Sequence, residues 1–216
     1  NATKKEFNND VILNQISDKI LNKLREANIH GGEDAEYRSW QNSLVFMRNV
    51  LDDSEIADDV NVAIEYQIPR TSKRVDFIIA GADSDNKSNI IVVELKQWEK
   101  VEKIDDEMLH SVRAFTGGAN RMVSHPSYQA YSYAVFIRNS SEQVQDENIN
   151  MVPCAYLHNY DEKYIEEAKE EKIPKRKPVI LKIAGMAAAF VVGVVALGTV
   201  GFLLFPGASA GGGTNR

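Results

Sequence analysis

Cysteine and net positive charge are both scarce in this sequence. Cys154 is the only cysteine among 216 residues, and the net charge is −6. A single thiol excludes an intramolecular disulfide, fits a reducing compartment and leaves too few ligands for a zinc site, so we interpret Cys154 as a core residue. The acidic balance excludes a basic field over the whole surface, although a local groove on an acidic protein can still be basic.

Several recognisable segments are also missing. No G-x-x-x-x-G-K-[ST] sequence occurs, which excludes a P-loop ATPase within these residues. The opening NATKKEFNND is polar, so no N-terminal signal peptide is expected. No internal repeat occurs, and the Gly-rich tail at 206–216 is the one stretch of low complexity.

One long stretch lacks charge altogether. Residues 183–205 contain no Asp, Glu, Lys or Arg. About 20 apolar residues cross a bilayer as a helix, so we predict a transmembrane helix over 183–205, with a buried core helix as the alternative. The preceding charged linker, 161–182, ends in a basic juxtamembrane cluster, which predicts that the N-terminal domain faces the cytoplasm.

Small residues recur at a spacing of four within this predicted helix. They are Gly185, Ala189 and Gly193. Small residues at that spacing let two membrane helices approach closely, which favours a homodimer. Gly and Ala are frequent throughout the segment, so the same spacing also arises without a dimer.

Residues 1–160 carry the periodic patterns of an α/β domain. Apolar residues at helical spacing predict helices over 9–27 and 34–51, and another after Pro126. A polar helical pattern covers 100–113, and Gly117–Gly118 ends it. Alternation with a period of two predicts strands over 61–69, 74–81, 89–98 and 151–160. This order of elements favours a sheet with helices on its faces.

The two central strands carry charged residues at one end. If these strands form an antiparallel hairpin around the turn DSDNKS, position 76 lies opposite position 94. Side chains alternate between the faces of a strand, so Asp76, Glu94 and Lys96 are predicted to share one face. Opposed Cβ atoms lie about 5 Å apart, and two carboxylates so close repel unless a cation lies between them.

The chemistry of this predicted cluster suits a divalent cation. Carboxylate oxygens from Asp76 and Glu94, with the Leu95 carbonyl, are hard ligands that favour Mg²⁺ or Mn²⁺. Lys96 can position an attacking water and stabilise negative charge on a phosphate. The alternative is a surface hairpin whose charges lie in water, because a D…E-x-K pattern is common by chance.

A second motif follows downstream. HPSYQAYSYA places Gln129 and Tyr133 at positions i and i+4, on one face of the predicted helix. Its tyrosines can also be ordinary core residues. A Q-x-x-x-Y pattern after D…E-x-K resembles the arrangement in RecB-like nucleases, where polar side chains of this helix support the active site and nucleic acid.

Longer stretches extend this resemblance. Residues 3–160 resemble the N-terminal domain of an uncharacterised bacterial helicase-associated family, which joins a PD-(D/E)xK-like nuclease domain to a Schlafen-type P-loop ATPase. The resemblance implies a restriction-endonuclease-like mixed sheet flanked by helices. This sequence departs from the family because it lacks the ATPase half. The stretches that carry it are RSWQNS (38–43), IPRTSKRVDFII (68–79), VVELKQWEKVE (92–102), HPSYQAYSYA (125–134) and PCAYLHNY (153–160).

The same superfamily often adds a further acid to the metal site. Here that acid is Glu36 on the second predicted helix or Glu65 on the strand before the hairpin. An exposed helical glutamate is the alternative for Glu36.

Candidate nucleic-acid contacts lie beside the acids. Gln97 follows Lys96 and can contact a phosphate or have a surface role. Arg70, Lys73 and Arg74 form a basic cluster that can bind phosphates, although charged residues at a strand edge also prevent aggregation.

Together these patterns predict a metal-dependent nuclease that hydrolyses DNA or RNA. The membrane helix suggests a tethered enzyme with a role in defence or DNA processing, and the missing ATPase suggests a separate ATPase or helicase partner. The alternatives are a non-catalytic module of nuclease fold that binds nucleic acid or a partner protein, and a membrane scaffold.

Overall fold

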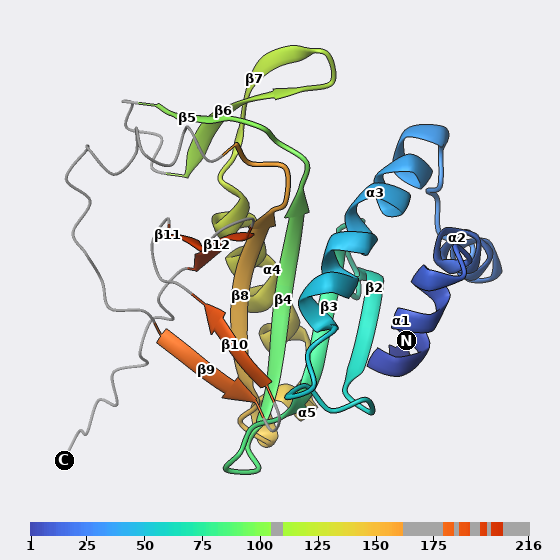
Figure 1. The fold of residues 1–216 in the computed structure, drawn as a ribbon, viewed down its shortest axis with the longest axis vertical. Helices are drawn as coiled ribbons and strands as arrows, with labels where there is room; N and C mark the ends of the chain where they lie inside the picture. Colours follow the sequence, from blue (N-terminus) through green and yellow to red (C-terminus); the bar gives the residue numbers. More distant parts are fainter. Residues whose placement is uncertain (105–109, 162–178, 184–185, 191–194, 198–199, 205–216) are drawn as a thin grey trace.

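A mixed β-sheet forms the centre of the described part of the chain (Figure 1). A computed structural model describes residues 1–104, 110–161, 179–183, 186–190, 195–197 and 200–204. The strand order of this sheet is β1-β2-β3-β4-β8-β12-β11. Neighbouring strands run antiparallel except for β4 and β8, which are parallel. The strands are β1 (Ala2–Thr3), β2 (Asn61–Gln67), β3 (Arg74–Ala82), β4 (Ser88–Lys96), β8 (Asn150–Leu157), β11 (Val195–Leu197) and β12 (Val200–Leu204).

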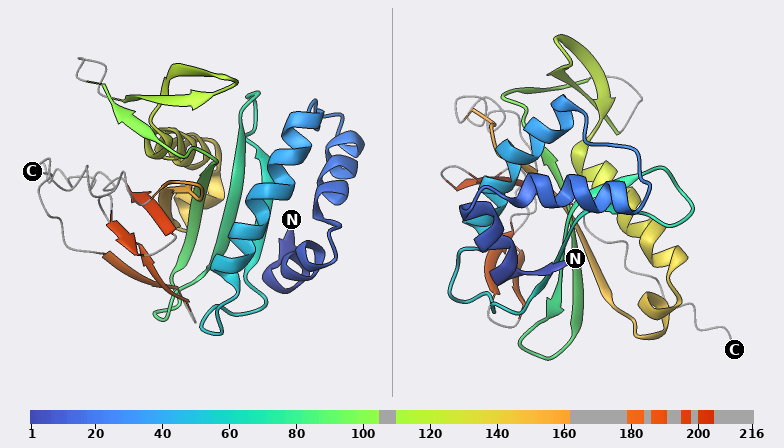
Figure 2. Two further views of the ribbon diagram at one scale, coloured as in Figure 1. Left: turned by 45° about the horizontal axis from the view of Figure 1, so that its top comes forward. Right: turned by 90° about the vertical axis from the view of Figure 1, so that its right-hand side faces the viewer.

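Helices cover both faces of this sheet, so the predicted α/β class with a mixed, helix-flanked sheet is confirmed (Figure 2). One face packs against the first three helices, and α4 packs against the other. The predicted strands correspond to β2, β3, β4 and β8. The helices are α1 (Lys4–Ile12), α2 (Ile16–Glu26), α3 (Asp34–Leu51), α4 (Pro126–Ser140) and α5 (Glu142–Asp146), of which α5 was not predicted.

The N-terminal helical region differs from the prediction of one helix over 9–27. Thr3 and Glu6 form a capping box that starts α1 earlier, because each side chain satisfies a backbone N–H of the other residue. Asn14 then adopts a φ of 53°, a left-handed conformation that interrupts the helix and separates α1 from α2. Apolar periodicity continues through the break, which is why the sequence pattern did not reveal it.

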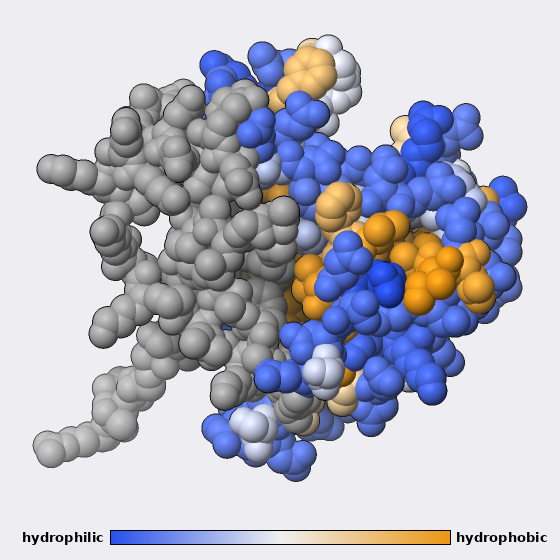
Figure 3. Space-filling model, viewed as in Figure 1, coloured by the Kyte–Doolittle hydropathy of each residue, from blue (hydrophilic) through white to orange (hydrophobic). Residues whose placement is uncertain are grey.

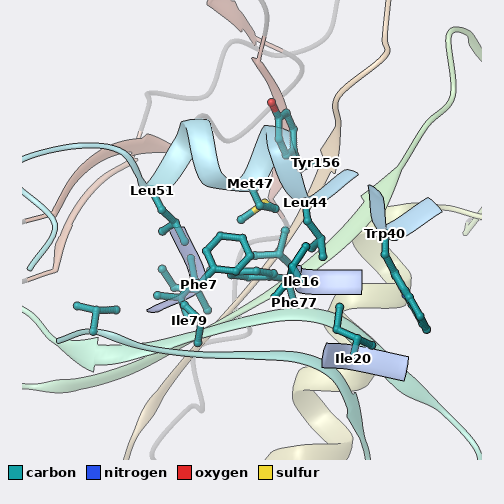
Figure 4. Packing of buried hydrophobic residues seen from close by; sticks show 14 of the residues in the cluster. Phe7, Ile16, Ile20, Trp40, Leu44, Met47, Leu51, Phe77, Ile79 and Tyr156 are labelled. Carbon is teal, nitrogen blue, oxygen red and sulfur yellow. The ribbon is translucent and has the colours of Figure 1, made fainter. Parts of the chain in front are cut away.

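Two clusters of buried side chains fix the sheet between its helices. The first joins α1, α2 and α3 to the sheet, and within it the rings of Phe7 and Phe77 meet edge to face with their centroids 5.1 Å apart (Figure 4). Cys154 is fully buried here, which confirms its predicted place in the core. The second cluster joins Ile78 and Val92 to α4. The strands of the β3–β4 hairpin are therefore covered on both faces.

The prediction of a polar helix over 100–113 is wrong. It contains β5 (Val101–Lys103) and the start of β6 (Ser111–Thr116), which pairs with β7 (Ala119–Ser124) in a separate sheet. Residues 105–109 lie outside the described ranges. Along β6 burial alternates with a period of two, and the pair Thr116↔Ala119 leaves Gly117 and Gly118 as a tight hairpin turn. The two glycines have φ of 59° and 77°, so they form a turn rather than ending a helix.

The predicted transmembrane helix over 183–205 has no helical counterpart in the described residues. Its described parts are the end of β9 (Val179–Ile183), β10 (Met186–Phe190), β11 and β12. The rest of this range and most of the charged linker, 162–178, lie outside the described residues. Among the residues described, no helix combines the length and apolar character that crossing a membrane requires.

Candidate active site

The β3–β4 hairpin brings the two predicted acids together. Its register pairs Phe77 with Val93, and one further step places Asp76 opposite Glu94. The backbone N–H of Leu95 donates to Asp76 Oδ2 at 2.7 Å. Asp76 is half-buried, and Glu94 is only 1% exposed. The predicted register is therefore confirmed, and it buries a pair of carboxyl groups at the end of two strands.

Lys96 lies beside this acid pair. Its Nζ donates to Glu94 Oε1 at 2.5 Å. Burial by itself would lower the pKa of Lys96, but the charges of Glu94 and Asp76 outweigh it and raise that pKa above its ordinary value. Lys96 is thus a protonated cation that partly neutralises two acids.

One oxygen of the acid pair has no partner. Among the described residues, Glu94 Oε2 is buried and accepts no hydrogen bond, although a buried carboxylate oxygen normally accepts one, and a proton on Glu94 can only be shared with Asp76. Burial, followed by repulsion from Asp76, raises the pKa of Glu94 to about 8. Burial also raises the pKa of Asp76, partly offset by Lys96. A divalent cation would satisfy the orphan oxygen and restore the ionised form of both acids, so the residues present fit such an ion.

The third candidate acid, Glu65, lies on β2 next to Asp76 in the sheet. It lies between the pairs Ile64↔Phe77 and Tyr66↔Val75 and has a φ of 52°. This conformation is strained for a residue with a side chain, and such strain is common at functional sites. Burial, followed by the charge of Asp76, raises the pKa of Glu65 to about 7.

Arg74 joins Glu65 to Glu36. Its guanidinium lies 3.1 Å from Glu65 Oε2 and also forms an ion pair with Glu36. Glu36 accepts a further hydrogen bond from the backbone of Gly32, and Glu65 accepts one from Trp40 Nε1 at 2.7 Å. Within the part of the chain described, no three side chains among His, Cys, Asp and Glu gather as ligands of one metal ion. Arg74 holds both outer acids, Glu36 and Glu65, in ion pairs.

A cavity of about 530 Å³ opens beside these groups. Helix α3, the strands β2, β3 and β4, and helix α4 all contribute to its wall. Its charged and aromatic lining residues are Glu36, Trp40, Glu65, Lys73, Arg74, Asp76, Lys96 and Tyr133. Of the predicted nucleic-acid contacts, Lys73 and Arg74 therefore reach the cavity. Arg70 is exposed on the loop between β2 and β3 and does not line it.

The two polar residues predicted on α4 do contact each other. Gln129 Nε2 donates to the Tyr133 hydroxyl at 3.0 Å. Burial, followed by the charge of Glu94, raises the pKa of Tyr133, so its hydroxyl keeps its proton. Lys73 Nζ lies 5.6 Å from the centre of the Tyr133 ring. The helix thus brings a hydrogen-bonding group and a ring to the cavity that Asp76 also lines.

Gln97 forms contacts that the sequence did not reveal. Its amide donates to Ser39 Oγ at 2.8 Å and Ser43 Oγ at 3.0 Å, which ties the end of β4 to α3. His158 Nε2 lies 3.0 Å from Ser43 Oγ on the far side. The spacing of the two serines within RSWQNS, at positions i and i+4, was the one sequence signal that could have indicated this contact. The phosphate contact predicted for Gln97 stays a prediction.

No family model, curated protein or solved structure matches this chain. The resemblance to the helicase-associated nuclease family therefore stays a prediction that depends on the residues quoted for it.

Proposed function

We propose that this chain is a divalent-metal-dependent nuclease that hydrolyses phosphodiester bonds of DNA. The observation that carries the proposal is the buried acid pair, in which Glu94 Oε2 accepts no hydrogen bond from any described residue beside Asp76. Burial of two adjacent carboxyl groups costs stability, and such an arrangement is typical of functional sites rather than of structural cores. The adjoining cavity is lined by Asp76 and Lys96, so it gives a substrate access to the Asp76 side of the pair.

Asp76, Glu94 and the main-chain carbonyl of Leu95 would hold Mg²⁺ or Mn²⁺. When bound, the ion lowers the pKa of a coordinated water and neutralises charge on the phosphate. Asp76 is held in place by the Leu95 N–H, so the hairpin backbone itself orients the ligand set. Glu65 is a further acid on the same cavity, where it forms an ion pair with Arg74.

Lys96 would contribute to the reaction by charge and position. Its ammonium group lies at the cavity wall, where it can hydrogen-bond an attacking water or a phosphate oxygen and stabilise the negative charge that develops. Tyr133 offers a protonated hydroxyl at the same wall, and Gln129 orients it. Lys73 supplies a further cation for the phosphate backbone.

The finer predictions belong to this proposal. A restriction-endonuclease-like core agrees with a mixed sheet in which an antiparallel hairpin precedes a parallel strand. A transmembrane helix over 183–205, a cytoplasmic N-terminal domain, a homodimer and a separate ATPase or helicase partner remain predictions from the sequence, as does a role in defence.

Hydrolysis by the full chain tests the proposal directly. Labelled DNA is incubated with the full chain in Mg²⁺, in Mn²⁺ and in EDTA, beside Glu94→Gln and the matched exposed control Glu55→Gln. We expect metal-dependent cleavage that Glu94→Gln lowers by about 10²–10³-fold or more, because it removes a charged ligand from the centre of the site. The control should keep wild-type activity.

A binding measurement separates metal loss from other defects. Calorimetric titration with Mn²⁺ should give one saturable site in the wild-type chain and in Glu55→Gln, and none in Glu94→Gln. A chain that binds no Mn²⁺ and leaves DNA intact in every buffer would contradict the proposed function.

A further inference from the structure

A second cavity of about 770 Å³ adjoins the acid site. Both cavities are lined by Ser39, Leu95 and Lys96, so a ligand that extends from one to the other passes these three residues. Lys96 Nζ lies 2.5 Å from Glu94 Oε1 and 5.5 Å from the centre of the Trp98 ring. Trp98 lines the second cavity, which is thus the direct continuation of the candidate active site.

The outer wall of this cavity is an exposed apolar surface on the β6–β7 hairpin. Phe115 is 64% exposed and Met122 is 55% exposed. Both occupy one face of the hairpin, because the register pairs Phe115 with Asn120 and Arg113 with Met122. Apolar atoms are visible on this protruding part of the molecule in Figure 3. We call Trp98, Phe115 and Met122 the apolar platform.

The charge around the platform favours a polyanion. The β6–β7 hairpin contains Arg113 and Arg121 and no Asp or Glu, and Lys96 lines the same cavity, while Glu102 on β5 lies opposite Arg113. An apolar protein partner would not need the cations that the hairpin itself and Lys96 place beside the platform. A nucleic acid does, because its phosphates attract cations while its bases stack on rings and apolar side chains.

We propose that the apolar platform binds unpaired bases of single-stranded DNA that flank the phosphodiester held at the acid pair. The inference rests on the proposed function and adds the substrate class. In a duplex, both faces of each base are covered by neighbouring base pairs, so only an unpaired base can lie against Trp98, Phe115 or Met122. Gln129, which lines the same cavity, offers hydrogen bonds to a base edge.

The chemistry of the acid site suits DNA. DNA lacks a 2′-hydroxyl and needs an external nucleophile such as a metal-activated water, which the pair Asp76 and Glu94 is suited to support. The site therefore fits hydrolysis by water.

Binding measured without cleavage tests the platform. Fluorescence anisotropy of the full chain in Ca²⁺ gives Kd for labelled oligothymidylate, for an abasic oligodeoxynucleotide of the same length, for a DNA duplex and for oligouridylate. The variant combines Phe115→Ala and Met122→Ala. Its control is Phe136→Ala, a phenylalanine that is 43% exposed on α4 and lines neither cavity. Circular dichroism checks that each variant is folded.

The expected pattern is specific for bases. The double variant should bind oligothymidylate about 5- to 150-fold more weakly per stacked base, because stacking contributes about 1–3 kcal/mol. Its affinity for the abasic strand and the duplex should match that of the wild type, and the Phe136 control should change nothing. An equal loss on the thymidylate and abasic strands, or no loss at all, would overturn the platform. Binding of oligouridylate in preference to oligothymidylate would overturn the assignment to DNA.

The platform and the proposed function can fail separately. If the wild-type chain hydrolyses DNA in Mn²⁺ but the double variant binds oligothymidylate as well as wild type, the proposed nuclease function stands and the proposed platform is wrong. If binding depends on bases but no metal supports hydrolysis, the proposed platform stands and the proposed nuclease function is wrong.

Discussion

The β3–β4 hairpin, which ends at Lys96, and the β6–β7 hairpin, which follows it in the chain, differ in which side chains they bury and which they expose. The β3–β4 hairpin is covered on both faces. Burial therefore raises the pKa of each of its acids, Asp76 and Glu94. The β6–β7 hairpin protrudes, and its large apolar side chains face solvent. One hairpin buries charge and the other exposes apolar surface. Each departs from the usual distribution of residues in a soluble domain, and a departure of this kind is expected where a ligand binds.

The largest expected effect separates buried charge from exposed charge. Lys96→Met should lower the free energy of unfolding by about 3 kcal/mol, because it leaves two buried acids without their cation. Lys100→Met is the matched substitution near the other hairpin, where Lys100 Nζ lies 3.0 Å from Glu102 and both side chains are almost half exposed. That pair should contribute about 0–1 kcal/mol. Urea denaturation of the metal-free chains measures both values, and equal losses would contradict the comparison.

The pH dependence of stability provides a second test. Glu94 and Glu65 have folded-state pKa values raised to about 8 and about 7. Their contribution to stability is complete below their ordinary pKa values and is lost as pH rises through the folded values. The metal-free chain should therefore become less stable between about pH 5 and pH 8, by at most about 1.4 kcal/mol per pH unit for each group.

Glu94→Gln isolates the larger of these two contributions. Glutamine mimics the protonated acid, so this variant should be more stable than wild type at pH 8 and similar to it at pH 5. Saturating Mn²⁺ should stabilise the wild-type chain increasingly as pH rises, because the metal requires ionised ligands. Thermal denaturation across this pH range measures the trend. A wild-type chain whose melting temperature rises steadily with pH in EDTA would show that the acid pair is not protonated as inferred.

A smaller effect is expected at the link between β4 and α3. Gln97→Ala removes the amide that donates to Ser39 and Ser43, and it should cost about 1–2 kcal/mol because partly buried partners lose their bonds. Gln67→Ala is the matched control, since its amide donates to Thr71 on the surface. We expect less than about 0.5 kcal/mol there. Chemical denaturation compares the two, and a costlier Gln67 variant would remove the role assigned to Gln97.

The acid site was predictable from sequence because a local pattern determines it. Alternation with a period of two gave both strands, and the turn between them gave the register that sets Asp76 opposite Glu94. The ion pairs of Arg74 with Glu36 and Glu65 were not predictable in the same way. They join three elements that are distant in sequence, and no local spacing indicates which acid a surface arginine will pair with.

The protruding hairpin was mispredicted for a related reason. Polar residues over 100–113 fit a helical pattern, and the pairing of β6 with β7 depends on a turn that begins only at Gly117. A pair of glycines between short segments with alternating burial is a hairpin signal as much as a helix terminator. The network of Gln97, Ser43 and His158 was missed as well, because His158 lies far along the chain.

The smallest expected effect lies at the tip of the β6–β7 hairpin. Gly118 has a φ of 77°, and a Cβ added there would meet nothing within 4 Å. Gly118→Ala therefore tests backbone conformation without a clash and should destabilise the hairpin locally by about 1 kcal/mol. Gly118→Asn should cost less, because asparagine tolerates the left-handed conformation better.

Hydrogen exchange of the β6 and β7 amides, together with the melting temperature of the whole chain, measures this local effect. We expect faster exchange in Gly118→Ala, partial recovery in Gly118→Asn and an unchanged melting temperature, because the hairpin forms its own sheet apart from the central one. Affinity for oligothymidylate should fall by up to about 5-fold in parallel, since the apolar platform depends on the hairpin. A fall in melting temperature of the whole chain would instead show that the two hairpins unfold as one unit, and the contrast between them would then concern chemistry alone and not stability.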